Sequence, residues 1–252
     1  METNLELIRQ EMQSANFPAR EVILSHANGL LDTMLDYKEL MLCYSSAVKL
    51  LQTKLEVLDG EFQLKYRRNP ISSIHTRLKS QTSIMEKMSR LGVPISRENI
   101  EENLSDIAGV RVICPYIDDI YLIADALTAQ EDVELVKRKD YIRDPKLNGY
   151  RSLHLIVRVP VYFAECVKQI RAEIQIRTIA MDFWASLEHQ IKYKKNTPDA
   201  EQIVAQLRDC ADVIAQTDEK MQSIRIQMDE LRGEPNETEA IFEKLKKFDV
   251  SF

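Results

Sequence analysis

Two short stretches decide the fold: Leu-His-Leu-Ile-Val-Arg-Val at residues 153–159 and Ala-Glu-Ile-Gln-Ile-Arg at residues 172–177. Apolar residues occupy every second position in both, which is the period of a β-strand. Two further apolar runs have strand composition, at residues 110–114 and 133–137. Helical spacing of apolar residues occurs around them, at residues 80–91, 96–103 and 121–127. The alternation of elements predicts an α/β (α+β) fold with a mixed sheet flanked by helices.

Both ends of the chain have helical patterns. Before residue 66, leucines recur mostly at three, four or seven residues, with Gly29 and Gly60 as candidate helix ends. This stripe consists of Leu31, Leu35, Leu42, Leu51, Leu55 and Leu58. We therefore divide the chain into an N-terminal helical extension (1–66), a central domain (67–195) and a C-terminal helical segment (196–252).

The C-terminal segment carries a heptad-like apolar seam. Its members lie mostly three or four residues apart: Ile203, Leu207, Cys210, Ile214, Met221, Ile224, Met228 and Leu231. Before it, Trp184, Leu187 and Ile191 mark one face of a shorter helix. The seam fits two arrangements equally well, docking on the body of the same chain or contact with another subunit.

Composition excludes several classes of protein. The 252 residues carry a formal net charge of -6, which is unlike a general nucleic-acid binder. No apolar run reaches the roughly 20 residues that span a bilayer, and the first residues lack secretory-leader character, so we expect a cytoplasmic protein. The cysteines are without metal-site spacing and are expected to be reduced, small apolar residues: Cys43, Cys114, Cys166 and Cys210.

A local basic patch stands inside this acidic chain. Residues 137–151 contain six Lys or Arg residues against two Asp residues, a charge that suits a small, highly charged anion. Pro145 and Gly149 shape the loop around Lys146, while Tyr150 offers a ring for stacking on a base and Asn148 an amide for reading it. His154 follows on the polar strand face, and the pattern alone leaves open whether its role is structural or functional.

Two carboxylates flank this patch. Glu173 lies on the polar side of its strand with Gln175 and Arg177, a row that is either solvated or lines a cleft. Asp106 precedes the strand at 110–114, and Gly109 permits a close approach of other groups. Magnesium prefers one or two carboxylates together with phosphate oxygens and water. Two carboxylates beside a cationic loop thus favour Mg²⁺-dependent phosphoryl chemistry.

A third cluster surrounds the start of the helix at 80–91. Ser80 can open this helix, whose N-terminus would then attract phosphate. Ser83 and Lys87 are four residues apart and share a helix face, so both can reach one phosphate chain. Neither the P-loop pattern nor the Gly-x-Gly-x-x-Gly dinucleotide pattern occurs.

Taken in order, these motifs resemble the RelA/SpoT-type synthetases in their short, synthetase-only form, the small alarmone synthetases. The matching segments are Arg-Leu-Lys-Ser (77–80), Asp-Ile-Ala-Gly-Val-Arg (106–111), Lys-Arg-Lys-Asp-Tyr-Ile (137–142), Asn-Gly-Tyr-Arg-Ser-Leu-His (148–154), Glu-Ile-Gln-Ile-Arg-Thr (173–178) and Asp-Phe-Trp-Ala-Ser-Leu-Glu-His (182–189). The resemblance implies a nucleotidyltransferase-like synthetase domain with about five strands. It also implies a pyrophosphokinase that transfers the β,γ-pyrophosphate of ATP to the 3′-hydroxyl of GDP or GTP, giving ppGpp or pppGpp and AMP.

Site residues follow from the same resemblance. Asp106 and Glu173 would hold Mg²⁺ and act in catalysis, with Glu173 as general base. The ATP contacts would come from Arg77, Lys79, Ser83, Lys87 and Arg111. The GDP or GTP contacts would come from Lys139, Lys146, Asn148, Tyr150, His154 and Gln175. Short members of the family form homotetramers, so the resemblance also implies a homo-oligomer.

Control by nucleotides or RNA is less defined. The basic loop resembles the family's basic version, although its first residue is Lys137 instead of Arg. Ser73 and His75 do not form a nucleotide-binding signature, so allosteric control by the product is not predicted. Nucleic acid is not expected to take part in catalysis, and regulatory RNA stays open.

Two other functions compete with synthesis of the alarmone. One is a pyrophosphokinase with a different acceptor, either an adenine nucleotide or a tRNA 3′ end, which Asn148, Tyr150 and the modest charge disfavour. The other is a non-catalytic nucleotide- or RNA-binding oligomer, which the presence of both Asp106 and Glu173 disfavours. All three bind nucleotides, so only turnover separates them.

Overall fold

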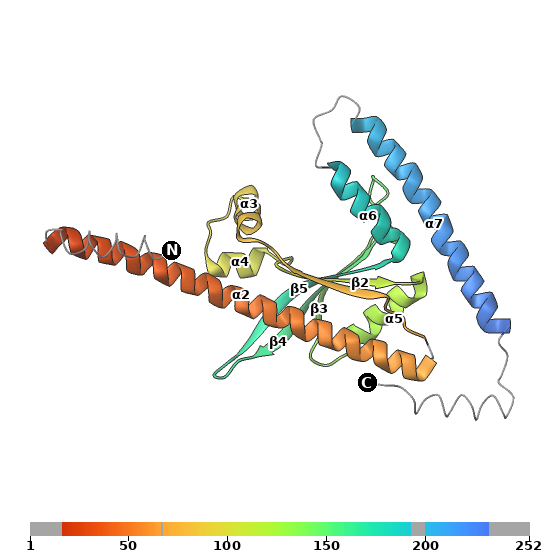
Figure 1. Ribbon diagram of the computed structural model, residues 1–252, viewed down its shortest axis with the longest axis horizontal. Coiled ribbons are helices and arrows are strands. Elements are labelled where there is room, and N and C mark those ends of the chain that lie inside the picture. Colours follow the sequence, from red (N-terminus) through yellow and green to blue (C-terminus); the bar gives the residue numbers. More distant parts are fainter. Residues whose placement is uncertain (1–16, 67, 193–199, 232–252) are drawn as a thin grey trace, which may run out of the picture.

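The computed structural model of the chain describes residues 17–66, 68–192 and 200–231. A five-stranded sheet in the order β1-β2-β5-β4-β3 forms its centre (Figure 1). The strands are β1 (Ser73–Leu78), β2 (Ala108–Cys114), β3 (Glu134–Asp140), β4 (Leu153–Tyr162) and β5 (Val167–Thr178). Strands β2 and β5 run parallel and the other neighbours antiparallel, so the predicted mixed sheet with helices is confirmed.

The described helices are α2 (Phe17–Tyr66), α3 (Gln81–Leu91), α4 (Arg97–Asn103), α5 (Ile117–Thr128), α6 (Ile179–Lys192) and α7 (Ala200–Leu231). Helix α2 crosses one face of the sheet with α5 beside it, while α3 and α4 lie toward one end and α6 and α7 toward the other (Figure 1). The main core lies between α2, α5 and the sheet. In these described ranges no helix combines the length and the apolar character needed to cross a membrane.

Helix α2 differs from its prediction in two ways. It continues through Gly29 and Gly60, which were candidate helix ends or soft spots. A Cβ at Gly60 would meet nothing within 4 Å, so packing imposes no break there. The buried face includes Leu51 and Leu55 as predicted, whereas Leu35 and Leu42, assigned to the same stripe, are exposed. The burial of Leu51 and Leu55 against the sheet stabilises the helix by more than the roughly 1 kcal/mol that a glycine inside a helix costs.

The short helices α3 and α4 begin and end at the predicted residues. Ser80 caps α3 by accepting a hydrogen bond from the Ser83 backbone N–H, and Gly92 ends it with a left-handed φ of 67°. Ser96 caps α4 in the same way. The cap at Ser80 matters for the site, because it places the first turn of α3 directly after β1.

Strand β1 was not predicted. Its sequence Ser-Ile-His-Thr-Arg-Leu has no clean apolar alternation, because β1 is an edge strand and most of its residues are exposed. Its hydrogen bonds to β2, with Arg77 opposite Gly109, supply the order that composition does not encode.

Only the first part of the predicted C-terminal seam docks on the body of the chain. Leu207 and Ile214 face the body of the chain and pack beside the buried Ala211. The later members Met221, Ile224, Met228 and Leu231 are exposed, as is Cys210. Polar residues occupy the inner positions there instead, since Asp218 accepts a 2.6 Å hydrogen bond from Thr178 and Gln222 and Arg225 contact Asp118.

Helix α6 also turns a different face inward. Trp184 is buried as predicted, but Leu187 is exposed and Ile191 lies outside the residues whose side chains are described. The neighbouring Glu188 is buried instead, because its carboxylate accepts a 2.9 Å hydrogen bond from the Asn148 amide. The inward face of α6 thus combines the apolar Trp184 with a polar contact to the loop.

Candidate active site

Two rows of residues cross the sheet on the face opposite its apolar core. The strand register places His75, Arg111, Gln175, His154 and Lys139 in one row across all five strands. The adjacent row is Arg77, Gly109, Glu173, Ile156 and Lys137. Neighbours in a row lie about 5 Å apart and point the same way. The register therefore brings to one surface the residues predicted to bind ATP (the donor side) and those predicted to bind GDP or GTP (the acceptor side).

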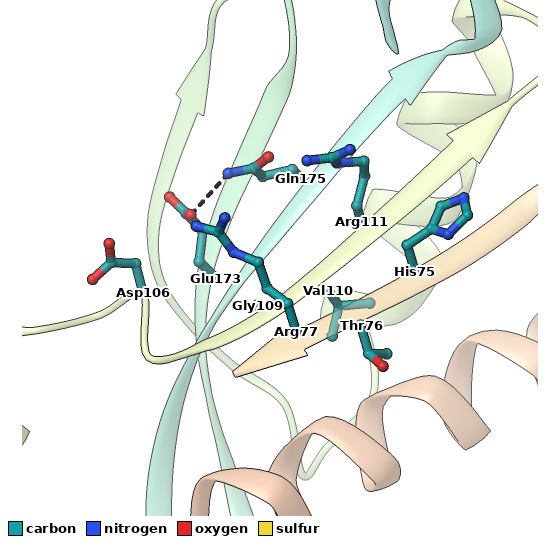
Figure 2. Close-up of a pocket in the computed structure, with 9 residues that line it drawn as sticks. All are labelled: His75, Thr76, Arg77, Asp106, Gly109, Val110, Arg111, Glu173 and Gln175. Atoms are coloured by element: carbon teal, nitrogen blue, oxygen red, sulfur yellow. Dashed lines mark hydrogen bonds between the residues drawn. The ribbon is translucent and has the colours of Figure 1, made fainter. Parts of the chain in front are cut away.

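A cavity of about 250 Å³ opens on this surface (Figure 2). It is lined by His75, Thr76, Arg77, Asp106, Gly109, Val110, Arg111, Glu173 and Gln175. Five of these were predicted as site residues, and they come from three separate sequence motifs. The polar row of β5 thus lines a cleft, which was one of the two arrangements that the sequence left open.

Gly109 creates the space for Arg77. A Cβ built at Gly109 would lie 3.3 Å from Cγ of Arg77, tighter than ordinary contact. Figure 2 shows the Arg77 side chain extending from β1 over β2 toward Glu173. The close approach predicted at Gly109 is therefore used to bring a cation from the edge strand to the central carboxylate.

Asp106 is held between two lysines. Its Oδ2 accepts a 2.8 Å hydrogen bond from Nζ of Lys79, and its Oδ1 accepts one of 2.7 Å from Nζ of Lys87. Burial alone would raise the pKa of Asp106, but these two ammonium groups outweigh it and hold the pKa below its ordinary value. Ser83, predicted beside Lys87, accepts a hydrogen bond from the Ser80 hydroxyl at the helix start.

Glu173 receives one partner on each oxygen. Nδ1 of His154 lies 3.3 Å from its Oε1, and the Gln175 amide donates to its Oε2 at 2.9 Å. Burial raises the pKa of Glu173, and the contacts with His154 and Gln175 reverse that effect, so the net pKa is lowered. The carboxylate is therefore ionised at neutral pH and oriented from both sides.

The acceptor-side residues gather around the Tyr150 ring. Nζ of Lys146 lies 4.6 Å from the ring centroid, and the Tyr150 hydroxyl is 2.8 Å from Nε2 of His154. Asn148 is fixed by Glu188, as described above. Lys139 pairs with His154 in the β3–β4 register. These five predicted residues and Gln175 thus occupy one continuous region beside Glu173.

Arg111 faces the cavity with an unused donor. Its Nη1 lies 3.3 Å from Oδ1 of Asp182. Burial lowers the pKa of this guanidinium, and the charge of Arg177 lowers it further. Its buried Nε has no acceptor within the described part of the chain. A phosphate oxygen is a suitable acceptor for such a group.

Sequence reasoning did not assign three residues that contact the site. Arg177 donates to the Tyr150 hydroxyl and to Gln175, Asp182 bridges Arg177 and Arg111, and Glu188 orients Asn148. The alternation that placed Glu173 and Gln175 on one face also includes Arg177, so this signal was present. Asp182 and Glu188 depend on how α6 packs, which the pattern did not predict correctly.

The donor set suits a hard divalent cation. Asp106 and Glu173 line the same cavity, where the charge of Asp106 opposes the net lowering of the Glu173 pKa. The described ranges contain no cluster of three or more His, Cys, Asp or Glu residues with metal-binding geometry. Two carboxylates fit Mg²⁺, which usually completes its coordination with water and substrate phosphate.

Comparison with known proteins agrees with this geometry. Residues 76–198 match the family described as "Region found in RelA / SpoT proteins". The GTP pyrophosphokinase YwaC of Bacillus subtilis is 44% identical over 209 residues, covering 83% of this chain and 100% of that protein.

Solved structures from Bacillus subtilis have the same fold. The small alarmone synthetase 2 structure has 45% identity and a TM-score of 0.69, covering 76% of this chain and 99% of the other. Small alarmone synthetase 1 bound to its product pppGpp has 34% identity and a TM-score of 0.69, covering 77% and 98%. The chain belongs to the RelA/SpoT synthetase family, and the relatives that it matches over nearly their whole length include small alarmone synthetases.

Proposed function

We propose that the protein is a (p)ppGpp synthetase working in the cytoplasm. It transfers the β,γ-pyrophosphate of ATP to the 3′-hydroxyl of GDP or GTP and releases AMP. The observation that carries this proposal is the placement of Glu173 between a cationic cavity containing Arg77 and Arg111 and the Tyr150 region. A relative named GTP pyrophosphokinase and a neighbour crystallised with pppGpp support it.

The cavity is the ATP side of the site. Arg77 and Arg111 contact adenine and the phosphates, since guanidinium groups both stack and form paired hydrogen bonds. Lys79, Lys87 and Ser83 lie at the start of α3 and meet the triphosphate there. Both lysines already pair with Asp106. When the phosphates of ATP bind, the lysines therefore exchange one anionic partner for another.

Mg²⁺ is held by Asp106 and Glu173 in this proposal. When bound, the ion neutralises charge that develops on the transferred phosphoryl group. The two carboxylates come from different segments, a loop before β2 and the middle of β5. Their shared cavity places them where they can act on the same phosphate chain.

The guanine nucleotide occupies the Tyr150 side. Lys146 lies over this ring and belongs to an exposed loop. When the guanine base stacks on the ring it takes the place of the Lys146 ammonium group, which then contacts the phosphates of the nucleotide. Asn148, Lys139, His154 and Gln175 surround the nucleotide. This arrangement directs the 3′-hydroxyl toward Glu173, next to His154.

Glu173 accepts the hydroxyl proton as the nucleophile attacks. Its lowered pKa keeps it ionised but makes it a weak base, so proton removal supplies only part of the rate enhancement. Phosphoryl transfer depends mostly on cations that stabilise spread charge, and Arg77, Lys79 and Lys87 supply these. The abundance of cations around one weak base is consistent with that chemistry.

The test uses γ-labelled ATP with Mg²⁺ and, separately, GDP, GTP, GMP, ADP and uncharged tRNA. Label moving to GDP or GTP with one AMP released per transfer supports the proposal, and label moving only to ADP or tRNA refutes the guanine acceptor.

Glu173→Gln should reduce turnover at least 100-fold, the scale of a general base. The matched control Glu134→Gln lies on β3, in an exposed ion pair with Arg158, and should retain activity. Near-normal turnover by the Glu173 variant would remove its assigned role.

We also propose a homo-oligomer, a tetramer by family resemblance. Its support is the exposed apolar row on α7, formed by Met221, Ile224, Met228 and Leu231. Light scattering of the purified chain tests this, and Ile224→Glu should shift the mass downward if the row is an interface. A monomeric wild-type protein would contradict the proposal.

A further inference from the structure

We propose that Arg177 is the positioning residue of the acceptor side, because it is the common donor for two hydrogen-bonded arms that end on Glu173. The inference rests on the proposed function and adds a residue to its site. One arm runs from Arg177 through Tyr150 and His154, and the other runs through Gln175. With Glu173 they close a ring of five side chains.

Arg177 is buried in a way that requires all of its contacts. It is 5% exposed, and an unpaired guanidinium at such a position is strongly unfavourable. It donates to the Ser152 hydroxyl at 3.3 Å and to Oδ1 of Asp182 at 3.0 Å. Its Nη2 donates both remaining bonds, to the Tyr150 hydroxyl at 2.6 Å and to Oε1 of Gln175 at 2.9 Å. A planar guanidinium therefore fixes Tyr150 and Gln175 relative to one another.

The direction of the bonds follows from Arg177, which can only donate. Since the Tyr150 oxygen accepts from Arg177, its own proton is directed at Nε2 of His154, 2.8 Å away. Nε2 then accepts, which leaves the histidine proton on Nδ1, beside Oε1 of Glu173 at 3.3 Å. In the other arm, Gln175 accepts from Arg177 through its oxygen and donates to Oε2 of Glu173 through its nitrogen. Each oxygen of Glu173 thus receives one proton donor from a chain that begins at Arg177.

This arrangement has a consequence for binding. Tyr150 is the proposed stacking platform for guanine, and its ring is also 5.2 Å from the Arg177 guanidinium. Removal of Arg177 frees the ring and the carboxylate together, so acceptor binding and turnover both suffer. The donor side is linked less directly, through Asp182 to Arg111.

The test measures kcat and KM for GTP and for ATP in Arg177→Met and Arg177→Lys. Arg177→Met should lower kcat/KM for GTP about 100-fold, with a larger rise in KM for GTP than for ATP, because misplacement of about 1 Å costs that much. Arg177→Lys should recover about tenfold of this loss, since it keeps the charge and part of the donation. The matched control is Arg171→Met on the same strand and face, whose guanidinium donates to Glu102 O outside the ring. It should retain wild-type constants.

A role for Arg177 as a mere anchor of α6 makes a different prediction. Asp182→Asn weakens the tie to α6 and leaves both acceptor-side bonds, so it should not reproduce the selective rise in KM for GTP. The ¹⁵N spectrum of His154 gives a readout independent of activity. We expect the Nδ1–H form in the wild type and its loss in Arg177→Met.

The proposal is overturned if Arg177→Met keeps both GTP constants within about twofold of the wild type. It is also overturned if Asp182→Asn matches it, or if the His154 spectrum is the same with and without Arg177. Absence of product from the wild type and Arg171→Met would instead refute the proposed function, while the histidine spectrum would still test Arg177.

Discussion

The contact between Gly149 and α7 allows a quantitative test of how the acceptor loop is held. Gly149 has a φ of 85°, which costs a residue with a side chain about 1–2 kcal/mol. A Cβ there would lie 2.5 Å from Cβ of Ala211, well inside contact distance. Inserting a methyl group into a packed contact costs a further 1–3 kcal/mol, approximately. Gly149→Ala should therefore lower the free energy of unfolding by about 2–5 kcal/mol, or displace the loop.

A double-mutant cycle with Ala211→Gly separates these two terms. The second change removes the clashing methyl group but not the backbone strain, and alone it costs about 1 kcal/mol of helix propensity. We expect Gly149→Ala and Ala211→Gly to couple favourably by about 1–3 kcal/mol, the size of the packing term.

Urea titration gives the unfolding free energies of the four proteins, and steady-state kinetics give KM for GTP and ATP. If the loop moves instead of the protein unfolding, KM for GTP should rise in Gly149→Ala and recover in the double variant, with KM for ATP unchanged. Coupling near zero in both measurements would refute the idea that α7 fixes the acceptor loop through this contact.

Three further predictions follow from burial and charge. The pKa values of Glu173 and Asp106 are lowered in the folded protein. The stability that these two carboxylates contribute is therefore present above their ordinary pKa values, and it is lost as the pH falls through their pKa values in the folded state. Because Glu173 must be ionised to act as the proposed general base, the acid limb of kcat/KM should lie below pH 4.5, the ordinary pKa of a glutamate. An acid limb above pH 4.5 would contradict this role of Glu173. Trp184 is the single tryptophan and lies 6.4 Å from the Tyr150 ring, so GTP should change its fluorescence more than a non-hydrolysable ATP analogue; the opposite order would place guanine elsewhere. Arg68→Met should lower the unfolding free energy by about 3–5 kcal/mol because it leaves the fully buried Asp119 unpaired, and Asp119→Asn should lower it less in the same denaturation assay.

Local sequence patterns predicted the strands that have one face in the core and the other in the site. Strands β4 and β5 bury one face against α2 and line the site with the other, so their alternation was clear in the sequence. Strand β1 buries little, and its polar edge sequence therefore carried no strand signal. Helical spacing on α7 fitted more than one face, and the face that docks was decided by polar pairs such as Thr178 with Asp218.

The sequence predicted which types of residue form the site, but not which of these residues contact one another. The motifs supplied carboxylates, cations and an aromatic ring, but the contact of Arg77 with Gly109 and its position beside Glu173 depend on the strand order β1-β2-β5. Strand order is a long-range property, and apolar periodicity says nothing about it. For the same reason Arg177 was seen on the correct strand face while its link to Tyr150 was not.

The two carboxylates are stabilised by different means, and this difference explains why both persist in one cavity. Asp106 is compensated by two full charges, Lys79 and Lys87, whereas Glu173 is held mainly by His154 and Gln175. Lysines on long, flexible stems can turn from a carboxylate to a phosphate when substrate and cation arrive. The ring around Glu173 begins at a rigid, buried guanidinium and has no such freedom. In the proposed mechanism the ATP side thus exchanges partners during turnover, and the guanine-nucleotide side keeps its geometry.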